Sequence, residues 1–181
     1  MPSLPQPLQY YTYEDYKNWE GEWELIDGFA MAPSPTISHQ AIASEIVFEL
    51  IKSVRECKNC LVVTKQDWKI NETTIIKPDI ALICNEENKA YITKAPLIVV
   101  EIISKTTAIR DEKYKFKIYK DEKVKYYVLV YPQDLKAKIY KLEDNQYIKQ
   151  GDFLEEESFF NELECKASIN FKEVFRKLRG E

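Results

Sequence analysis

Two runs of apolar residues near the middle of the chain predict strands that are buried on both faces of a sheet. Residues 97–103 read Leu-Ile-Val-Val-Glu-Ile-Ile, and residues 79–84 are apolar from the second position onward. Runs of this length without polar alternation are typical of central strands. Each run contains one carboxylate, Asp79 or Glu101. Because an unpaired buried ion costs several kcal/mol, the two carboxylates indicate a site for a cation.

A four-residue repeat of apolar side chains predicts a long helix over residues 37–55. Ile42, Ile46, Leu50 and Val54 form the repeat, and the Pro-Ser-Pro segment 33–35 precedes it as a break. We expect a second helix over residues 107–120, where the Thr107 hydroxyl can cap the first turn. Both helices should pack on the sheet that the buried strands form.

Shorter patterns complete the prediction. They are a capped helix at 10–19, a hairpin at 23–31 that turns at Asp27-Gly28, strands at 61–70, 125–131 and 138–142, and a short helix near 170–178. The expected fold class is α/β, in an α+β arrangement with a central mixed β-sheet flanked by helices. The length of 181 residues suits one domain. Within it we expect an N-terminal helix and hairpin at 10–32, a core at 36–142 and a C-terminal extension at 143–181.

The composition, 45% hydrophobic and 31% charged, is typical of a globular protein. No segment approaches the roughly 18 apolar residues of a membrane helix, and residues 1–8 lack the charged and apolar regions of a signal peptide. We therefore expect a cytoplasmic protein without membrane attachment. Four cysteines include one CxxC pair, at 57–60, without the second pair that a zinc site of this type needs. We expect reduced thiols.

The distribution of charge is more informative than its sum. A net charge of −4 disfavours a protein that coats nucleic acid without specificity. Residues 105–125, however, carry eight cations and four anions. This stretch is either a solvated helix face of mixed charge or a surface that binds phosphate, and spacing alone favours the solvated face.

Residues that the chain lacks exclude several kinds of catalysis. His39 is the only histidine and there is no GxSxG motif, so a Ser-His-Asp arrangement is poorly supported. The four glycines form no phosphate-binding loop. Carboxylate and metal chemistry remain. Each candidate also has an ordinary structural interpretation: Asp79 can open a strand, Glu24 can stabilise a hairpin, His39 can cap a helix or pack in the core, and Lys115 can lie on the surface.

The spacing of the two acids resembles a known nuclease motif. Pro78-Asp79 followed after 22 residues by Glu101 is similar to the paired acids of the PD-(D/E)XK nuclease superfamily. Within it, residues 13–140 resemble the Uma2 family of restriction endonuclease-like proteins. The resemblance rests on an ordered set of positions: Glu24-Leu25-Ile26-Asp27-Gly28, Met31, the segment 33–35, His39, Pro78-Asp79, residues 96–104, Thr107, Asp111, Lys115, Tyr119, Val124, Tyr127 and Pro132.

One position departs from the superfamily pattern, which places lysine two residues after the second acid. This chain has Ile103 there, and Lys115 matches the lysine that the family carries on the following helix. The cation must therefore come from elsewhere or be missing, and Lys115 is the candidate.

The resemblance implies a restriction endonuclease-like core and a Mg²⁺-dependent endodeoxyribonuclease, with Mn²⁺ as a substitute metal. It implies that Asp79 and Glu101 hold the metal with the Ile102 carbonyl, that Lys115 assists the water or the phosphate, and that Glu24 completes the acidic cluster. His39, Asp111 and Tyr119 are expected at the periphery of the site. DNA is the expected partner, and a homodimer is compatible with the sequence. The alternative is a noncatalytic module that binds nucleic acid or protein and retains this fold; an unrelated hydrolase is a third reading.

Overall fold

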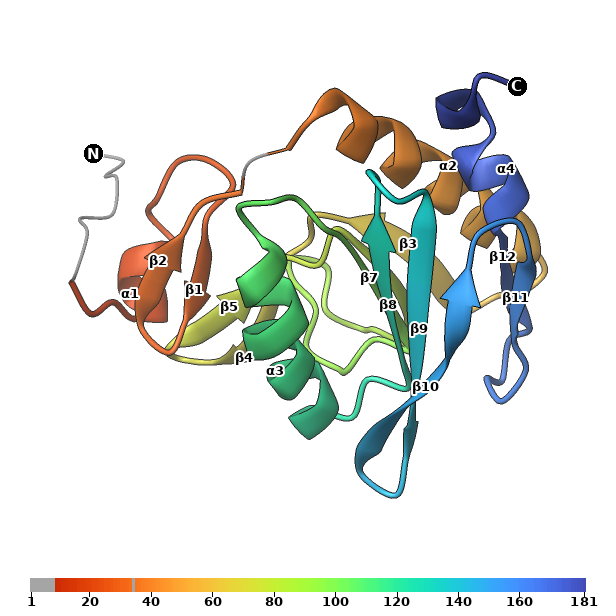
Figure 1. Ribbon diagram of the computed structural model, residues 1–181. Coiled ribbons are helices and arrows are strands. Elements are labelled where there is room, and N and C mark those ends of the chain that lie inside the picture. The colour runs from red at the N-terminus through yellow and green to blue at the C-terminus, as the bar shows by residue number, and fades with distance from the viewer. Residues whose placement is uncertain (1–8, 34) are drawn as a thin grey trace.

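The computed structural model describes residues 9–33 and 35–181 (Figure 1). The segment 1–8, in which we expected no signal peptide, and Ser34 of the predicted break lie outside the described residues. A six-stranded sheet forms the centre, in the order β10-β9-β8-β7-β6-β3. Only β7 and β8 run parallel among these neighbours, so the predicted mixed sheet is confirmed. The strands are β3 (Cys60–Thr64), β6 (Ile80–Cys84), β7 (Ile98–Ile102), β8 (Tyr126–Tyr131), β9 (Lys136–Glu143) and β10 (Gln146–Phe153).

Alternation along β7 divides its side chains between two cores. Val100 packs in the core that contains Ile42 of helix α2, whereas Val99 packs in the core that contains Tyr119 of helix α3. Successive strand residues point to opposite faces, so Glu101 lies on the face of Val99. Figure 1 shows α3 and α2 on different sides of the sheet. The helices are α2 (Ile37–Ser53) and α3 (Phe116–Asp121).

The C-terminal extension adds to the core on the α2 side. Phe160, Phe171 and Phe175 are fully buried there, and the Asn170 amide donates to the buried Glu49 of α2 at 3.3 Å. The extension lies beside α2 in Figure 1. It contains β11 (Glu157–Phe160), β12 (Ala167–Asn170), α4 (Phe171–Phe175) and the turn η2 (Lys177–Arg179). The sequence predicted only its helix, because these strands are short.

A second sheet, in the order β2-β1-β5-β4, lies on the other side of the molecule (Figure 1). The predicted turn joins β1 to β2 with positive φ at both Asp27 and Gly28. A Cβ atom at Gly28 would overlap the ring of Tyr10, so both the backbone conformation and the space require glycine. The elements are α1 (Tyr13–Tyr16), β1 (Glu24–Ile26), β2 (Phe29–Met31), β4 (Trp68–Asn71) and β5 (Thr74–Ile76).

The predicted strand at 61–70 is wrong, because the chain breaks at Lys65. The φ of Lys65 is 51°, in the left-handed region, and its amide donates to the Pro78 carbonyl at 3.1 Å. The segment before the break joins the central sheet as β3, and the segment after it joins the second sheet as β4. The break leaves Lys65 next to the start of β6.

The predicted helix at 107–120 contains an unexpected π-helical turn, η1 (Arg110–Lys115), before α3. The Thr107 hydroxyl accepts from the Ser104 amide at 3.0 Å, so it closes the turn before the helix and does not cap the helix as predicted. The carbonyl of Thr107 instead accepts from the Asp111 amide at 2.9 Å. A π-helical turn places more residues in one turn than an α-helix does.

The cysteines correct the expectation of reduced thiols. Cys60 and Cys84 lie directly opposite each other on β3 and β6 and form a disulfide. Cys57, after α2, forms a second disulfide with Cys165 of the C-terminal extension, with their Cα atoms 6.1 Å apart. Sequence spacing did not predict either pair, since strand register and the packing of the extension bring them together. Across residues 9–33 and 35–181, no helix is both long and apolar enough to cross a membrane.

Candidate active site

The two acids predicted from the sequence lie side by side in the structure. Asp79 directly precedes β6, and the pairing of Ile80 with Val100 brings it next to the end of β7. The Ile102 amide donates to Asp79 Oδ2 at 2.7 Å, and the Asp79 amide donates to Glu101 Oε2 at 3.4 Å. The pairing of β6 with β7 therefore places the two carboxylates next to each other.

Asp79 is held in its charged form. Besides the bond from Ile102, its Oδ2 atom is 3.1 Å from His39 Nε2, and its Oδ1 atom accepts from the Lys65 ammonium. Burial alone would raise the pKa of Asp79, but the hydrogen bond from His39 and the charge of Lys65 lower it below its ordinary value. Asp79 is therefore an anion at neutral pH.

Glu101 has a different environment, although it is only one hydrogen bond away. Its Oε1 atom accepts from Lys115 Nζ at 2.8 Å and from the Tyr119 hydroxyl at 2.5 Å. The Tyr119 ring stacks on Trp68 with their centroids 5.9 Å apart, which fixes the hydroxyl. Complete burial raises the pKa of Glu101 to about 8, against the opposing charge of Lys115 and with the added repulsion of nearby carboxylates.

Lys115 is a buried cation at the centre of the acids. Its Nζ atom lies 2.7 Å from Glu24 Oε1, 2.8 Å from Glu101 Oε1 and 3.8 Å from Asp111 Oδ1. Burial disfavours the ammonium, but the charges of Glu101, Glu24 and Asp111 outweigh it and raise the pKa of Lys115. Lys115 therefore stays protonated across the range in which proteins are normally studied.

Arg110 is a second cation in the cluster, and it bridges two of these acids. Its Nη1 atom lies 3.3 Å from Glu24 Oε2 and its Nε atom lies 3.1 Å from Asp111 Oδ1. Glu24 reaches the cluster from β1 of the second sheet, and it also accepts from the Lys77 amide at 2.7 Å. The cluster thus connects both sheets.

The π-helical turn brings the helix residues of the cluster onto one face. Lys115 and Tyr119 reach Glu101 of β7, Arg110 reaches Glu24 of β1, and Asp111 contacts Arg110 and lies 3.8 Å from Lys115. The Tyr127 hydroxyl of β8 donates to the Asp111 carbonyl at 2.8 Å and ties η1 to the sheet.

The charges in this cluster do not balance. Four carboxylates (Glu24, Asp79, Glu101 and Asp111) face three cations (Lys65, Arg110 and Lys115), and all seven side chains are buried or mostly buried. One negative charge is in excess. A proton on Glu101 or an added metal cation would remove it; burial is the main reason that the pKa of Glu101 is raised, and the repulsion of the neighbouring carboxylates adds to it.

The donor set suits a hard cation such as Mg²⁺. Ile103 donates to Val130 of β8, so the amide and carbonyl of Ile102 both face the Asp79 side, as the two groups of one strand residue do. In the part of the chain that the structure describes, no three His, Cys, Asp or Glu side chains form a ready-made metal centre. Mg²⁺ does not need one, because it keeps several waters and takes oxygens from the substrate. Asp79, Glu101 and the Ile102 carbonyl are the oxygen groups here that could hold such an ion.

The structure brings together every site residue that the sequence named, and adds two. Asp79, Glu101, Ile102, Lys115, Glu24, Asp111 and Tyr119 form one network, and His39 joins it through Asp79. His39 Nδ1 is buried without a hydrogen-bond partner among the described residues. Lys65 and Arg110 were missed. Only the register of β3 and β6 identifies Lys65, and the sequence does not show that register. It pairs Thr64 with Ile80 and so places residue 65 opposite Asp79.

The basic stretch 105–125 contributes less free charge than its composition indicates. Arg110 and Lys115 point inward, Lys117 pairs with Asp121 at 2.6 Å, and Lys125 pairs with Glu162 at 3.2 Å. Lys105 is exposed and lies in the loop after β7. The role of this stretch as a phosphate-binding surface stays a prediction.

A family model described as "Putative restriction endonuclease", named Uma2, matches residues 8–169. The chain belongs to the Uma2 family. A crystal structure from Anabaena variabilis, described as a putative nuclease belonging to DUF820, has a fold similar to that of this Uma2 protein. Its TM-score is 0.72 at 19% sequence identity, and the alignment covers 92% of this chain and 98% of that one. No curated protein matches this Uma2 protein.

Proposed function

We propose that this Uma2 protein is a Mg²⁺-dependent endonuclease that hydrolyses phosphodiester bonds of DNA, with Mn²⁺ as a substitute metal. The observation that carries the proposal is the pairing of Asp79 with Glu101 next to the buried ammonium of Lys115. Membership of a restriction endonuclease family supports the reaction class. The excess negative charge of the cluster supports the uptake of a divalent cation.

Asp79, Glu101 and the Ile102 carbonyl are the groups that would hold Mg²⁺. When bound, this ion polarises a phosphate and lowers the pKa of a bound water. The protein groups around the acids fix their orientation: Tyr119 donates to Glu101, while His39 and Lys65 contact Asp79. Such supporting hydrogen bonds keep ligands in position before the substrate arrives.

Lys115 acts as a charge stabiliser in this mechanism and not as a base. Because the neighbouring carboxylates raise its pKa, it has no tendency to accept a proton from water at neutral pH. An ammonium held in a buried site can donate to a phosphate oxygen and stabilise the charge that develops there. Glu24 and Asp111 also contact Lys115 and help to hold it in place.

One observation favours the alternative of a noncatalytic module that binds nucleic acid or protein. Lys65 contacts Asp79 directly, so an ammonium already occupies one oxygen of a proposed metal ligand. A metal would have to share Asp79 with Lys65 or displace it. In the noncatalytic alternative, the cations of the cluster are its permanent counter-ions.

Cleavage of plasmid DNA separates the two functions. With Mg²⁺ or Mn²⁺ the wild-type protein should cut the plasmid, Glu101→Gln should not, and the exposed Glu20→Gln should cut as the wild type does. Circular dichroism should show that all three are folded, and titration calorimetry should detect Mg²⁺ binding only where Glu101 is present. A folded wild-type protein that neither binds Mg²⁺ nor cleaves single- or double-stranded DNA would rule out the nuclease and leave the binding module.

A further inference from the structure

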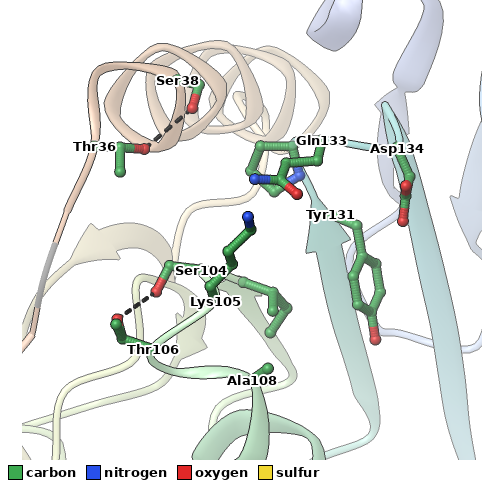
Figure 2. A pocket seen from close by; sticks show the side chains of 11 residues that line it. Thr36, Ser38, Ser104, Lys105, Thr106, Ala108, Tyr131, Gln133 and Asp134 are labelled. Carbon is green, nitrogen blue, oxygen red and sulfur yellow. Dashed lines mark hydrogen bonds between the residues drawn. The ribbon is translucent and has the colours of Figure 1, made fainter.

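An open pocket of about 480 Å³ adjoins the acidic cluster at the ends of β7 and β8. Figure 2 shows that three segments surround it: the start of α2, the loop after β7 and the turn after β8. Nothing in the proposed reaction uses this space. The lining residues are Thr36, Ser38, Ile103, Ser104, Lys105, Thr106, Ala108, Tyr131, Pro132, Gln133 and Asp134.

The pocket lies beside the candidate active site, and the two spaces share Ser104 as a lining residue. Ser104 also lines the narrow space that contains His39, Asp79 and Ile102. The pocket lies at the carboxyl ends of the one parallel strand pair of the central sheet. Ligands of α/β proteins commonly bind at this edge of a sheet. A substrate held at Asp79 and Glu101 can therefore extend into the pocket.

One wall of the pocket has the chemistry of a phosphate site. Hydroxyl groups gather there in two hydrogen-bonded pairs, Thr36 with Ser38 at 3.1 Å and Ser104 with Thr106 at 3.0 Å. Figure 2 shows the Lys105 ammonium projecting between these pairs and the turn after β8. The first turn of the 17-residue helix α2 adds the positive end of its dipole.

The remaining lining residues have the chemistry of a nucleobase site. Ile103, Ala108 and Pro132 provide apolar surface, and Tyr131 adds an aromatic ring. The Gln133 amide and the Asp134 carboxylate lie at the rim and can donate to or accept from the polar edge of a base (Figure 2). Stacking on an apolar or aromatic surface combined with hydrogen bonds at the edge is how proteins recognise unpaired bases.

We propose that this pocket binds one unpaired nucleotide of the strand that is cut, next to the scissile phosphate. The proposal rests on the proposed nuclease function and names its substrate class, single-stranded or locally unpaired DNA. The pocket has the volume of a small-molecule site, and a base enters such a site only after it leaves the base pair and the stack. An intact duplex cannot place a base there.

Binding measurements on the full chain test this assignment. We would use Ca²⁺ in place of Mg²⁺ to suppress cleavage, and compare a short labelled single strand with its duplex by fluorescence anisotropy. The wild-type protein should bind the single strand about tenfold more tightly than the duplex. Gln133→Trp should fill the pocket at an exposed turn and abolish this preference, whereas Gln150→Trp, the same change on the exposed strand β10, should keep it. A fluorescent adenine analogue in the strand should report unstacking with the wild type and not with Gln133→Trp.

The outcomes separate this inference from the nuclease proposal. If the preference and its loss in Gln133→Trp are observed but no DNA is cut with Mg²⁺, the pocket assignment stands and the nuclease proposal fails. If DNA is cut but single strand and duplex bind equally, or Gln133→Trp binds as the wild type does, the pocket assignment fails and the nuclease proposal stands. Failure to bind either DNA overturns the pocket assignment.

Discussion

The two site acids should respond in opposite ways when their charge is removed. We expect Glu101→Gln to stabilise the metal-free protein at neutral pH and Asp79→Asn to destabilise it. The reason is that the surroundings raise the pKa of Glu101 to about 8 and lower that of Asp79. A simple repulsion between two neighbouring carboxylates would instead predict that both changes stabilise the fold.

The magnitude for Glu101 follows from the linkage between pKa and folding. A carboxyl group whose pKa is raised on folding contributes stability that is complete below its ordinary value of 4.5 and is lost as the pH rises toward 8. Each pH unit between these values lowers the free energy of unfolding of the wild type by about 1.4 kcal/mol. At pH 7 the wild type has therefore lost about 3 kcal/mol, whereas the Glu101→Gln variant loses none by this route. The stability of Glu101→Gln relative to the wild type should therefore grow by about 3 kcal/mol between pH 4.5 and pH 7.

The magnitude for Asp79 follows from its hydrogen bonds. The ionised carboxylate contacts Ile102, His39 and Lys65, and a hydrogen bond to a charged group contributes about 1.5–3 kcal/mol. Asparagine keeps one acceptor but places an amide donor near the Lys65 ammonium, so we expect a loss of about 2–4 kcal/mol. Because the pKa of Asp79 is lowered, this stability is present above its ordinary value of 3.8 and disappears only as the pH falls below it.

Urea unfolding followed by circular dichroism, with a chelator present, measures both effects across this pH range. Glu20→Gln, at an exposed position, is the control for the loss of one carboxylate. If the free energies of unfolding of Glu101→Gln and the wild type run parallel between pH 4.5 and pH 8, Glu101 is ionised throughout and the account of its burial is wrong. Stabilisation by Asp79→Asn would likewise show that the contacts of Asp79 do not hold its charge.

Two further predictions concern the cations. Lys115→Met should abolish plasmid cleavage and lower the free energy of unfolding by about 3–5 kcal/mol, because it leaves buried carboxylates unpaired. Lys117→Met is the control, because Lys117 belongs to an exposed ion pair. It should change neither plasmid cleavage nor the free energy of unfolding by much. An unfolding free energy of Lys115→Met equal to that of the wild type would contradict the charge cluster. Lys105→Ala should reduce the slope of log affinity against log salt for single-stranded DNA by about 0.7, as expected for one lost phosphate contact, and an unchanged slope would remove Lys105 from the phosphate wall.

The site could be predicted where it depends on strand periodicity. The run 97–103 is apolar on both faces except at Glu101, so the sequence itself marks that residue as a buried charge. Asp79 could be predicted in the same way, because it stands at the start of the second buried strand. Lys115 belongs to the helix that connects the two parallel strands, and this connection places it near both acids. Resemblance to the Uma2 family added Glu24, whose hairpin belongs to another sheet and has no local signal that points to the site.

The parts that failed depend on contacts between distant segments. Lys65 lies in a left-handed conformation inside what reads as one continuous strand, and only the bond from its amide to Pro78 shows why the chain turns there. Cys57 and Cys165 are separated by 108 residues, so no spacing rule pairs them. The strands of the C-terminal extension are short and pack on α2, so their burial is visible only in three dimensions.

The π-helical turn η1 makes the position of Lys115 depend on chain length as well as on residue identity. Lys115 lies 14 residues after Glu101, and the wider turn of η1 accommodates one residue more than α-helical spacing would, so the same number of residues in an α-helix would turn the lysine away from the acids. A relative that lacks this extra residue would need its lysine one position nearer to the acid. Alignment by fixed spacing would then pair Lys115 with the wrong residue. At this helix, deletion of a single residue within η1 should therefore leave the ammonium in the acid cluster while changing its sequence distance from Glu101.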